Sequence, residues 1–247
     1  MSPRASTRKA KTMSRRVLEV IVCSVADALE AQRGGANRLE VIRDFRRGGL
    51  TPPLELVQDI LAAVTLPVRV MLRESESYEV AGEAERERLC DAAHNLSELN
   101  VDGVVLGFLS AGGVDVQLTE LVLACAPNLR ATFHHAFEEA EDPTNAIKVL
   151  KRLNQVDRIL TSGGAGEWPE KIKRLARYRE EAGPEIEILA GGGIDQQSIQ
   201  MIAPATGIRE FHVGRAAREP ASAGGIVRSE RVKALVASVQ EGRSEQR

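Results

Sequence analysis

The chain has 247 residues, of which 43% are hydrophobic and 28% charged, as in a globular protein with a sizeable core. A formal net charge of −2 and an aromatic content of 3% argue against a nucleic-acid partner, and no apolar run approaches the roughly 20 residues that span a membrane. Three widely spaced cysteines favour a reducing compartment over a disulfide framework.

Short β-branched runs alternate with longer amphipathic stretches, which is the pattern of βα units around a parallel sheet. The expected strands are residues 17–22, 38–42, 68–72, 103–107, 131–135, 158–162, 186–192 and 210–214. The expected helices are residues 24–33, 53–64, 83–99, 142–153, 168–181 and 196–202. Eight strands with helices between them predict one α/β domain, a (β/α)8 TIM-like barrel, with an open doubly wound sheet as the alternative.

The two ends of the chain differ in composition from the rest. Residues 1–16 are basic and polar and lack the apolar stretch of a secretory signal, so we expect a disordered tail, with a targeting or anion-binding arm as the alternative. The sequence of residues 238–247 also predicts a disordered tail. The barrel is therefore expected over residues 17–237.

Charged and imidazole side chains lie within or just after several expected strands. In a barrel of this kind the C-terminal ends of the strands carry the site. The candidate catalytic residues are Glu19, Glu40, Arg73, His134 and His212. Burying such groups unpaired is costly, so we expect either a closed internal network, with both glutamates paired to Arg73, or a set that surrounds a polar ligand.

Glycine-rich segments follow the last three expected strands. Consecutive backbone N–H groups of such segments can hold an anion, and barrels often bind phosphate after strands seven and eight. The predicted anion-binding residues are Gly163, Gly192, Gly193, Gly214 and Arg215. The alternative is that these glycines only permit tight turns.

An ordered set of motifs resembles the CutC family of copper-homeostasis proteins. The motifs are LEVIVCSVADALEAQRGGANRLEV, GGLTP, VRVMLR, DGVVLGFL, TFHHAFE, DRILTSGG, AGGGI and REFH, and they extend over residues 18–212. The resemblance implies a TIM-like barrel, copper binding, a role in copper tolerance, a cytoplasmic location and a homo-oligomer. It also implies that the five candidate catalytic residues match the polar positions of the family, and it leaves open whether the protein is an enzyme.

The chain departs from the family pattern where copper ligands are proposed. Ile21 and Ile42 stand at positions that are often cysteine in the family, and Cys23 lies two residues from the first of them. Soft Cu(I) prefers thiolate or thioether ligands. The remaining candidate metal ligands, suited to Cu(II) or zinc, are His134, His212, Glu40 and Cys23.

Three functions follow from these observations. The first is a CutC-type copper-homeostasis protein. The second is an enzyme acting on a small phosphorylated or carboxylated metabolite, in which Glu19 or Glu40 is a general base, a histidine moves a proton and Arg73 neutralises the anion. The third is a non-catalytic scaffold that acts through an oligomeric surface.

Overall fold

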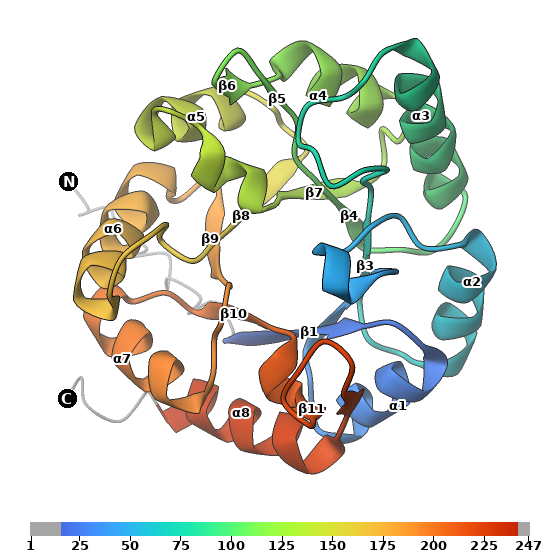
Figure 1. Cartoon of the computed structure of the whole chain (residues 1–247). Helices are drawn as coiled ribbons and strands as arrows, with labels where there is room; N and C mark the ends of the chain where they lie inside the picture. The colour runs from blue at the N-terminus through green and yellow to red at the C-terminus, as the bar shows by residue number, and fades with distance from the viewer. Residues whose placement is uncertain (1–15, 242–247) are drawn as a thin grey trace, which may run out of the picture.

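The computed structural model describes residues 16–241. Within them, eight parallel strands close into a barrel, and helices form a ring around it (Figure 1). The barrel strands are β1 Val17–Val22, β2 Arg38–Val41, β3 Val68–Met71, β4 Gly103–Leu106, β7 Arg130–Phe133, β8 Val156–Thr161, β9 Glu187–Ala190 and β10 Glu210–Val213. The pairing of β10 with β1 completes the barrel. The predicted TIM-like barrel is confirmed, and the open sheet is excluded.

The helices outside the barrel are α1 Val25–Arg33, α2 Leu54–Ala63, α3 Glu83–Ser97, α4 Val116–Ala124, α5 Pro143–Leu150, α6 Trp168–Ala182, α7 Gln196–Thr206 and α8 Ser229–Glu241. The short elements are the hairpins β5 Leu109–Ser110 with β6 Gly113–Val114 and β11 Arg218–Glu219 with β12 Ile226–Val227, and the 3-10 turns η1 Phe45–Arg47, η2 His135–Glu139 and η3 Arg215–Ala217. Helices α4 and α8 were not among the expected elements.

One expected boundary of the barrel is corrected by the structure. Helix α8 continues to Glu241, beyond residue 237, because Ser238 and Val239 are buried against the barrel rather than solvated. The tails expected over residues 1–15 and 242–247 lie outside the described residues. Within the described part of the chain, no helix is long and apolar enough to cross a membrane.

Local capping explains why several helices begin directly after a strand end. The side chain of Ser24 accepts a hydrogen bond from the backbone N–H of Asp27 at the start of α1, and Asp142 caps α5 ahead of its proline. At α7, Asp195 and Ser198 form a reciprocal capping box. Such caps satisfy N–H groups that a helix leaves unpaired, so the turns above the strands stay short and fixed.

The barrel interior near the N-terminal ends of the strands holds paired charges. Arg38 forms ion pairs with Glu19 and with Glu210, the latter at 2.8 Å, and Arg158 also binds Glu210 at 2.7 Å. Arg69 binds both carboxylate oxygens of Asp157, at 2.7 and 2.8 Å. This paired layer fills the interior at that end and leaves room for a cavity at the opposite end.

Candidate functional site

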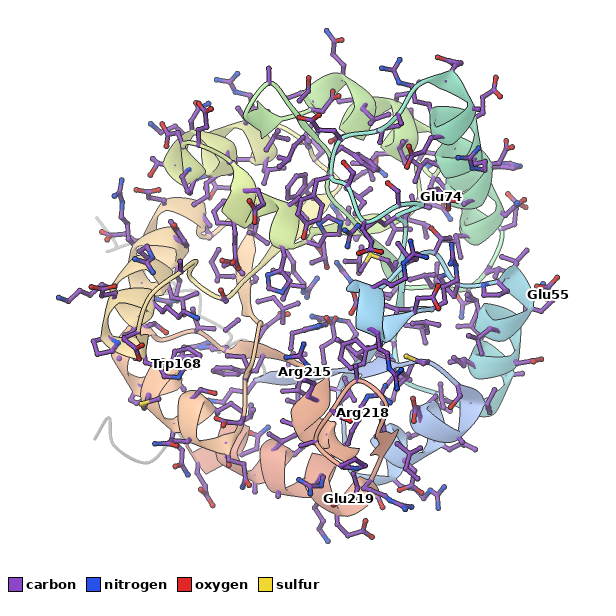
Figure 2. All side chains as sticks on the ribbon, viewed as in Figure 1. Glu55, Glu74, Trp168, Arg215, Arg218 and Glu219 are labelled. Carbon is purple, nitrogen blue, oxygen red and sulfur yellow. The ribbon has the colours of Figure 1, made fainter. Side chains whose placement is uncertain are left out.

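A cavity of about 670 Å³ opens at the C-terminal ends of the barrel strands. The predicted site residues that line it are Glu40, Arg73, His134, His212, Gly192, Gly193, Gly214 and Arg215. Figure 2 shows Arg215 close to the barrel axis, whereas Glu55 and Trp168 lie in the outer ring. The structure therefore brings together side chains from β2, β10 and the segments after β3, β7, β9 and β10.

The deepest part of the site is a chain of three side chains from neighbouring strands. His212 Nδ1 lies 2.8 Å from Glu19 Oε1, and His212 Nε2 lies 3.5 Å from Glu40 Oε2. All three side chains are buried, and Oε1 of Glu40 has no hydrogen-bond partner. The imidazole is thus fixed by Glu19, and Glu40, which lines the cavity, keeps one buried oxygen without a partner.

The two glutamates that contact His212 have opposite pKa shifts. Burial raises the pKa of Glu40 to about 7, since attraction to His212 offsets only part of the burial penalty. Burial also acts against ionised Glu19, but Arg38 and His212 bring its pKa far below the ordinary value. Burial lowers the pKa of His212, whereas Glu40 and Glu19 raise it to a net value above the usual range. Glu40 and the adjacent His212 are therefore placed to exchange a proton.

His134 is a neutral hydrogen-bond donor at the cavity wall. Its Nδ1 accepts a hydrogen bond of 3.2 Å from the backbone N–H of Ala136, which places the ring proton on Nε2. Burial and the nearby Arg73 hold its pKa well below the usual value, and Nε2 has no partner. A Cβ atom on Gly107 would lie 2.4 Å from His134 Nδ1, so a residue without a side chain is needed beside the ring.

Arg73 does not pair with either glutamate, contrary to the closed network that the sequence allowed. Its guanidinium lies 4.6 Å from the ring centroid of Tyr78 and donates to the backbone carbonyl of Glu76, while its Nε has no partner. Burial lowers its pKa against the opposing effect of Tyr78. Glu19 pairs instead with Arg38, because the N-terminal residue of β2 lies beside it in the sheet register.

A second carboxylate–imidazole pair, which the sequence analysis did not identify as a site, lies after β7. His135 lines the cavity, and its Nδ1 lies 3.0 Å from Glu138 Oε1. The same carboxylate accepts hydrogen bonds from the hydroxyl of Thr161 at 3.0 Å and the hydroxyl of Ser162 at 2.9 Å. The i, i+3 spacing of His135 and Glu138 was the available signal, but the contacts with Thr161 at the end of β8 and with Ser162 were not visible in the sequence.

The rim of the cavity carries positive charge and glycine backbone. Arg46 and Arg215 line it, and neither guanidinium has a hydrogen bond or ion pair among the described residues. Gly192 and Gly193 adopt positive φ angles of 81° and 86°, and a Cβ atom on Gly193 would meet no atom within 4 Å. The backbone here is therefore open to the approach of a small ligand.

Three predicted site residues lie away from this cavity. Glu19 lies behind His212 rather than at the surface of the cavity. Gly163 faces α6, where a Cβ atom would lie 2.8 Å from the backbone oxygen of Lys171. Cys23 lines a separate hollow, 3.7 Å from an Arg218 nitrogen, and burial raises its thiol pKa to about 11.

Comparison with known proteins places this barrel in a family. The pattern that defines the CutC family matches residues 16–217. The chain belongs to the CutC family. A human protein described as a copper homeostasis protein cutC homolog is 35% identical, with 79% of this chain and 72% of the human chain aligned. A CutC family protein of Bacteroides fragilis is 33% identical over 89% of this chain and 87% of its own.

A solved structure of a CutC relative has the same architecture. The crystal structure of the putative copper homeostasis protein CutC from Streptococcus agalactiae superimposes with a TM-score of 0.74 at 26% identity, covering 81% of this chain and 98% of the other. Family membership therefore rests on sequence and fold together. It assigns no ligand to the cavity of this chain.

The residues of the cavity fit a copper ion poorly. Ile21 and Ile42 form a buried apolar cluster with Met71 and Val105, against which Cys23 packs. Met71 is the one sulfur-containing side chain among the described residues that line the cavity, and Cu(I) prefers several soft ligands. Within residues 16–241, no group of three or more His, Cys, Asp or Glu side chains is arranged to hold a metal ion.

Proposed function

We propose that the chain binds a small phosphorylated or carboxylated metabolite in the cavity and moves a proton on it by acid–base chemistry. The observation that carries this proposal is Glu40, a residue of the cavity wall whose Oε1 is buried without a partner and whose pKa is raised to about 7. A carboxylate that changes protonation near neutral pH suits a general acid or base. A purely structural glutamate at this depth would be expected to have both oxygens satisfied.

The neighbouring side chains have complementary roles in this proposal. His212, oriented by Glu19, exchanges a proton with Glu40. His134 donates from Nε2 to an oxygen that gains negative charge, as a fixed donor in a dry site does effectively. Arg215 and Arg46 at the rim, with the glycine backbone, bind the anionic group of the ligand.

The binding part of the proposal is tested with inorganic phosphate and small carboxylates. Calorimetric titration of the whole chain should give saturable binding, and Arg215→Gln should weaken phosphate binding about tenfold, the loss of one charge-assisted contact. The matched control is Arg152→Gln, an exposed arginine between α5 and β8 at the other end of the barrel, which should bind like wild type. Absence of saturable binding to every anion would contradict the proposal.

Copper homeostasis, the process named for the human relative, is the second candidate function. Family membership supports it, and the same resemblance motivates our proposals of a cytoplasmic location and a homo-oligomer. The apolar cluster at Ile21 and Ile42 leads us to expect weak Cu(I) binding in the cavity. In competition with a chromophoric Cu(I) chelator, wild type should retain no more copper than Met71→Leu. If wild type takes Cu(I) from the chelator and Met71→Leu does not, copper binding in the cavity becomes the favoured function.

A further inference from the structure

The His135–Glu138 pair has the geometry of an oriented base. Glu138 accepts hydrogen bonds from Thr161, from Ser162 and from His135, so its position is fixed. Although burial opposes its ionisation, the bonds from His135 and Ser162 lower its pKa to about 2. An ionised Glu138 holds the proton of His135 on Nδ1. The lone pair of Nε2 then remains available on a side chain that lines the cavity.

The two imidazole centres lie on either side of one short glycine segment. A Cβ atom on Gly191 would lie 3.3 Å from His212 Cδ2, and a Cβ atom on Gly192 would lie 3.3 Å from His135 Cε1. His212 belongs to β10, whereas His135 follows β7. The cavity therefore has two acid–base groups that approach its interior from different strands and do not share a hydrogen bond.

We infer that the cavity is built for two proton transfers on one substrate, and that His135 is the second acid–base residue of an isomerase. The substrate class is a phosphorylated α-hydroxy ketone or α-hydroxy aldehyde, and this inference rests on the proposed function. A cavity of about 670 Å³ is large enough for such a molecule of three to six carbons, given the usual size of ligand pockets.

The reaction balances without a co-reactant. Glu40 takes a proton from the carbon that bears the hydroxyl group, and the electron pair of that C–H bond forms the C=C bond of an enediolate. The π electrons of the carbonyl group move to its oxygen, where the Nε2–H of His134 donates a hydrogen bond. His135 carries the hydroxyl proton to the other oxygen, and Glu40 returns its proton to the former carbonyl carbon. One carbon is oxidised and its neighbour is reduced by the same amount.

The other contacts of the cavity agree with this substrate class. The phosphate group needs fixed positive charge away from the reacting carbons, and Arg46 and Arg215 supply it at the rim. Neutral His134 can donate a hydrogen bond without giving up a full proton to the enediolate, because its pKa is low. The second oriented base has no evident role in holding the fold, since the contacts of Glu138 with Thr161 and Ser162 already join η2 to the end of β8.

The test uses the full chain in D₂O with dihydroxyacetone phosphate and a panel of phosphorylated α-hydroxy ketones of four to six carbons, followed by NMR. Wild type should incorporate deuterium at the hydroxyl-bearing carbon and form the aldose isomer. His94→Gln, at an exposed position on α3, is the matched control and should behave like wild type. Glu40→Gln should lose both reactions by about a hundredfold or more, as expected for loss of a general base.

His135→Gln separates the inference from the proposed function. It should retain deuterium incorporation through Glu40 but form the isomer at least about tenfold more slowly, and free imidazole should partly restore the rate of His135→Ala. Isomer formation by His135→Gln at the wild-type rate would remove His135 from the chemistry. If wild type incorporates no deuterium into any panel member, the isomerase inference is wrong. The binding part of the proposed function is then still tested separately, by calorimetric titration of wild type and Arg215→Gln with phosphate.

Discussion

The barrel interior contains two layers of buried charge that differ in how completely they are paired. Near the N-terminal ends of the strands, the guanidinium groups of Arg38, Arg69 and Arg158 all bind carboxylates on other strands, across the barrel interior. At the cavity end, Glu40 Oε1 and His134 Nε2 are as deeply buried but have no partner. The first layer is electrostatically complete without a ligand, and the second is not.

This difference distinguishes a structural network from a binding site better than burial or charge alone. An unpaired buried polar atom costs stability, so a layer of them is retained only where it serves another purpose. Three members of the apolar cluster, Ile21, Ile42 and Met71, line the cavity. An apolar wall lowers the local dielectric constant and so strengthens the electrostatic interactions beside it.

The largest effect is expected when an ion pair of the fully paired layer is removed. Arg38→Met removes the arginine partner of Glu19 and one of the two arginine partners of Glu210, and should lower the free energy of unfolding by about 3 kcal/mol, since both carboxylates stay buried. Urea unfolding followed by circular dichroism measures this change. Arg177→Met, which removes an exposed pair with Glu181, is the control and should change stability by less than about 0.5 kcal/mol. Equal effects of the two variants would mean that the internal layer is not structural.

In the layer at the cavity end, removing a charged group should stabilise the fold instead of destabilising it, and the effect should depend on pH. Because burial raises the pKa of Glu40 to about 7 from a value of 4.5, the folded state binds more protons than the unfolded state between these values. The free energy of unfolding therefore falls as pH rises from about 4.5 to 7. The pKa of His212 is also raised, mainly by Glu40 against the effect of burial, so its contribution is likewise lost as pH rises through its folded value.

Glu40→Gln should remove most of this pH dependence. Above pH 7 the variant should be more stable than wild type by about 2 kcal/mol, because no charge has to be buried, and near pH 5 the two should be similar. Glu19, which faces the same imidazole, contributes oppositely, since Arg38 keeps it ionised. Urea unfolding curves of both proteins at a series of pH values measure this difference in the free energy of unfolding. A Glu40→Gln variant that is less stable than wild type at pH 8 would show that the Glu40 charge stabilises the fold.

Much of the fold could be predicted because its determinants are local. The β-branched runs gave all eight barrel strands, each within a few residues of its observed bounds, since parallel strands buried on both faces are almost continuously apolar. The predicted strand over residues 186–192 is shorter in the structure, where β9 ends at Ala190, because the following glycines turn away from the sheet with positive φ angles. Helix α8 was missed because charged residues obscure its apolar face.

The site could be predicted only in part, for a different reason. Glu40, His134 and His212 were identifiable because they interrupt or directly follow apolar strands. Their partners were not, since the sheet register places Glu19 beside Arg38, and Arg73 lies against Tyr78 of the segment that follows β3. The role of Glu138 depends on contacts with the segment after β8, more than twenty residues away, which no local pattern encodes.

The smallest expected effect is that of an alanine substitution at a glycine that lines the cavity. Comparison with a glycine far from the cavity separates its effect on phosphate binding from its effect on stability. Gly193 and Gly207 both have positive φ, at 86° and 70°, so alanine at either position should cost about 1 kcal/mol of stability. Gly207 ends α7 at the opposite side of the barrel from the cavity, whereas Gly193 lines it. Gly193→Ala should therefore weaken phosphate binding by several-fold beyond Gly207→Ala, because its methyl group projects into open space that the anion would occupy. Equal phosphate affinities in the two variants would place the anion elsewhere, with Arg215 acting without the glycine backbone.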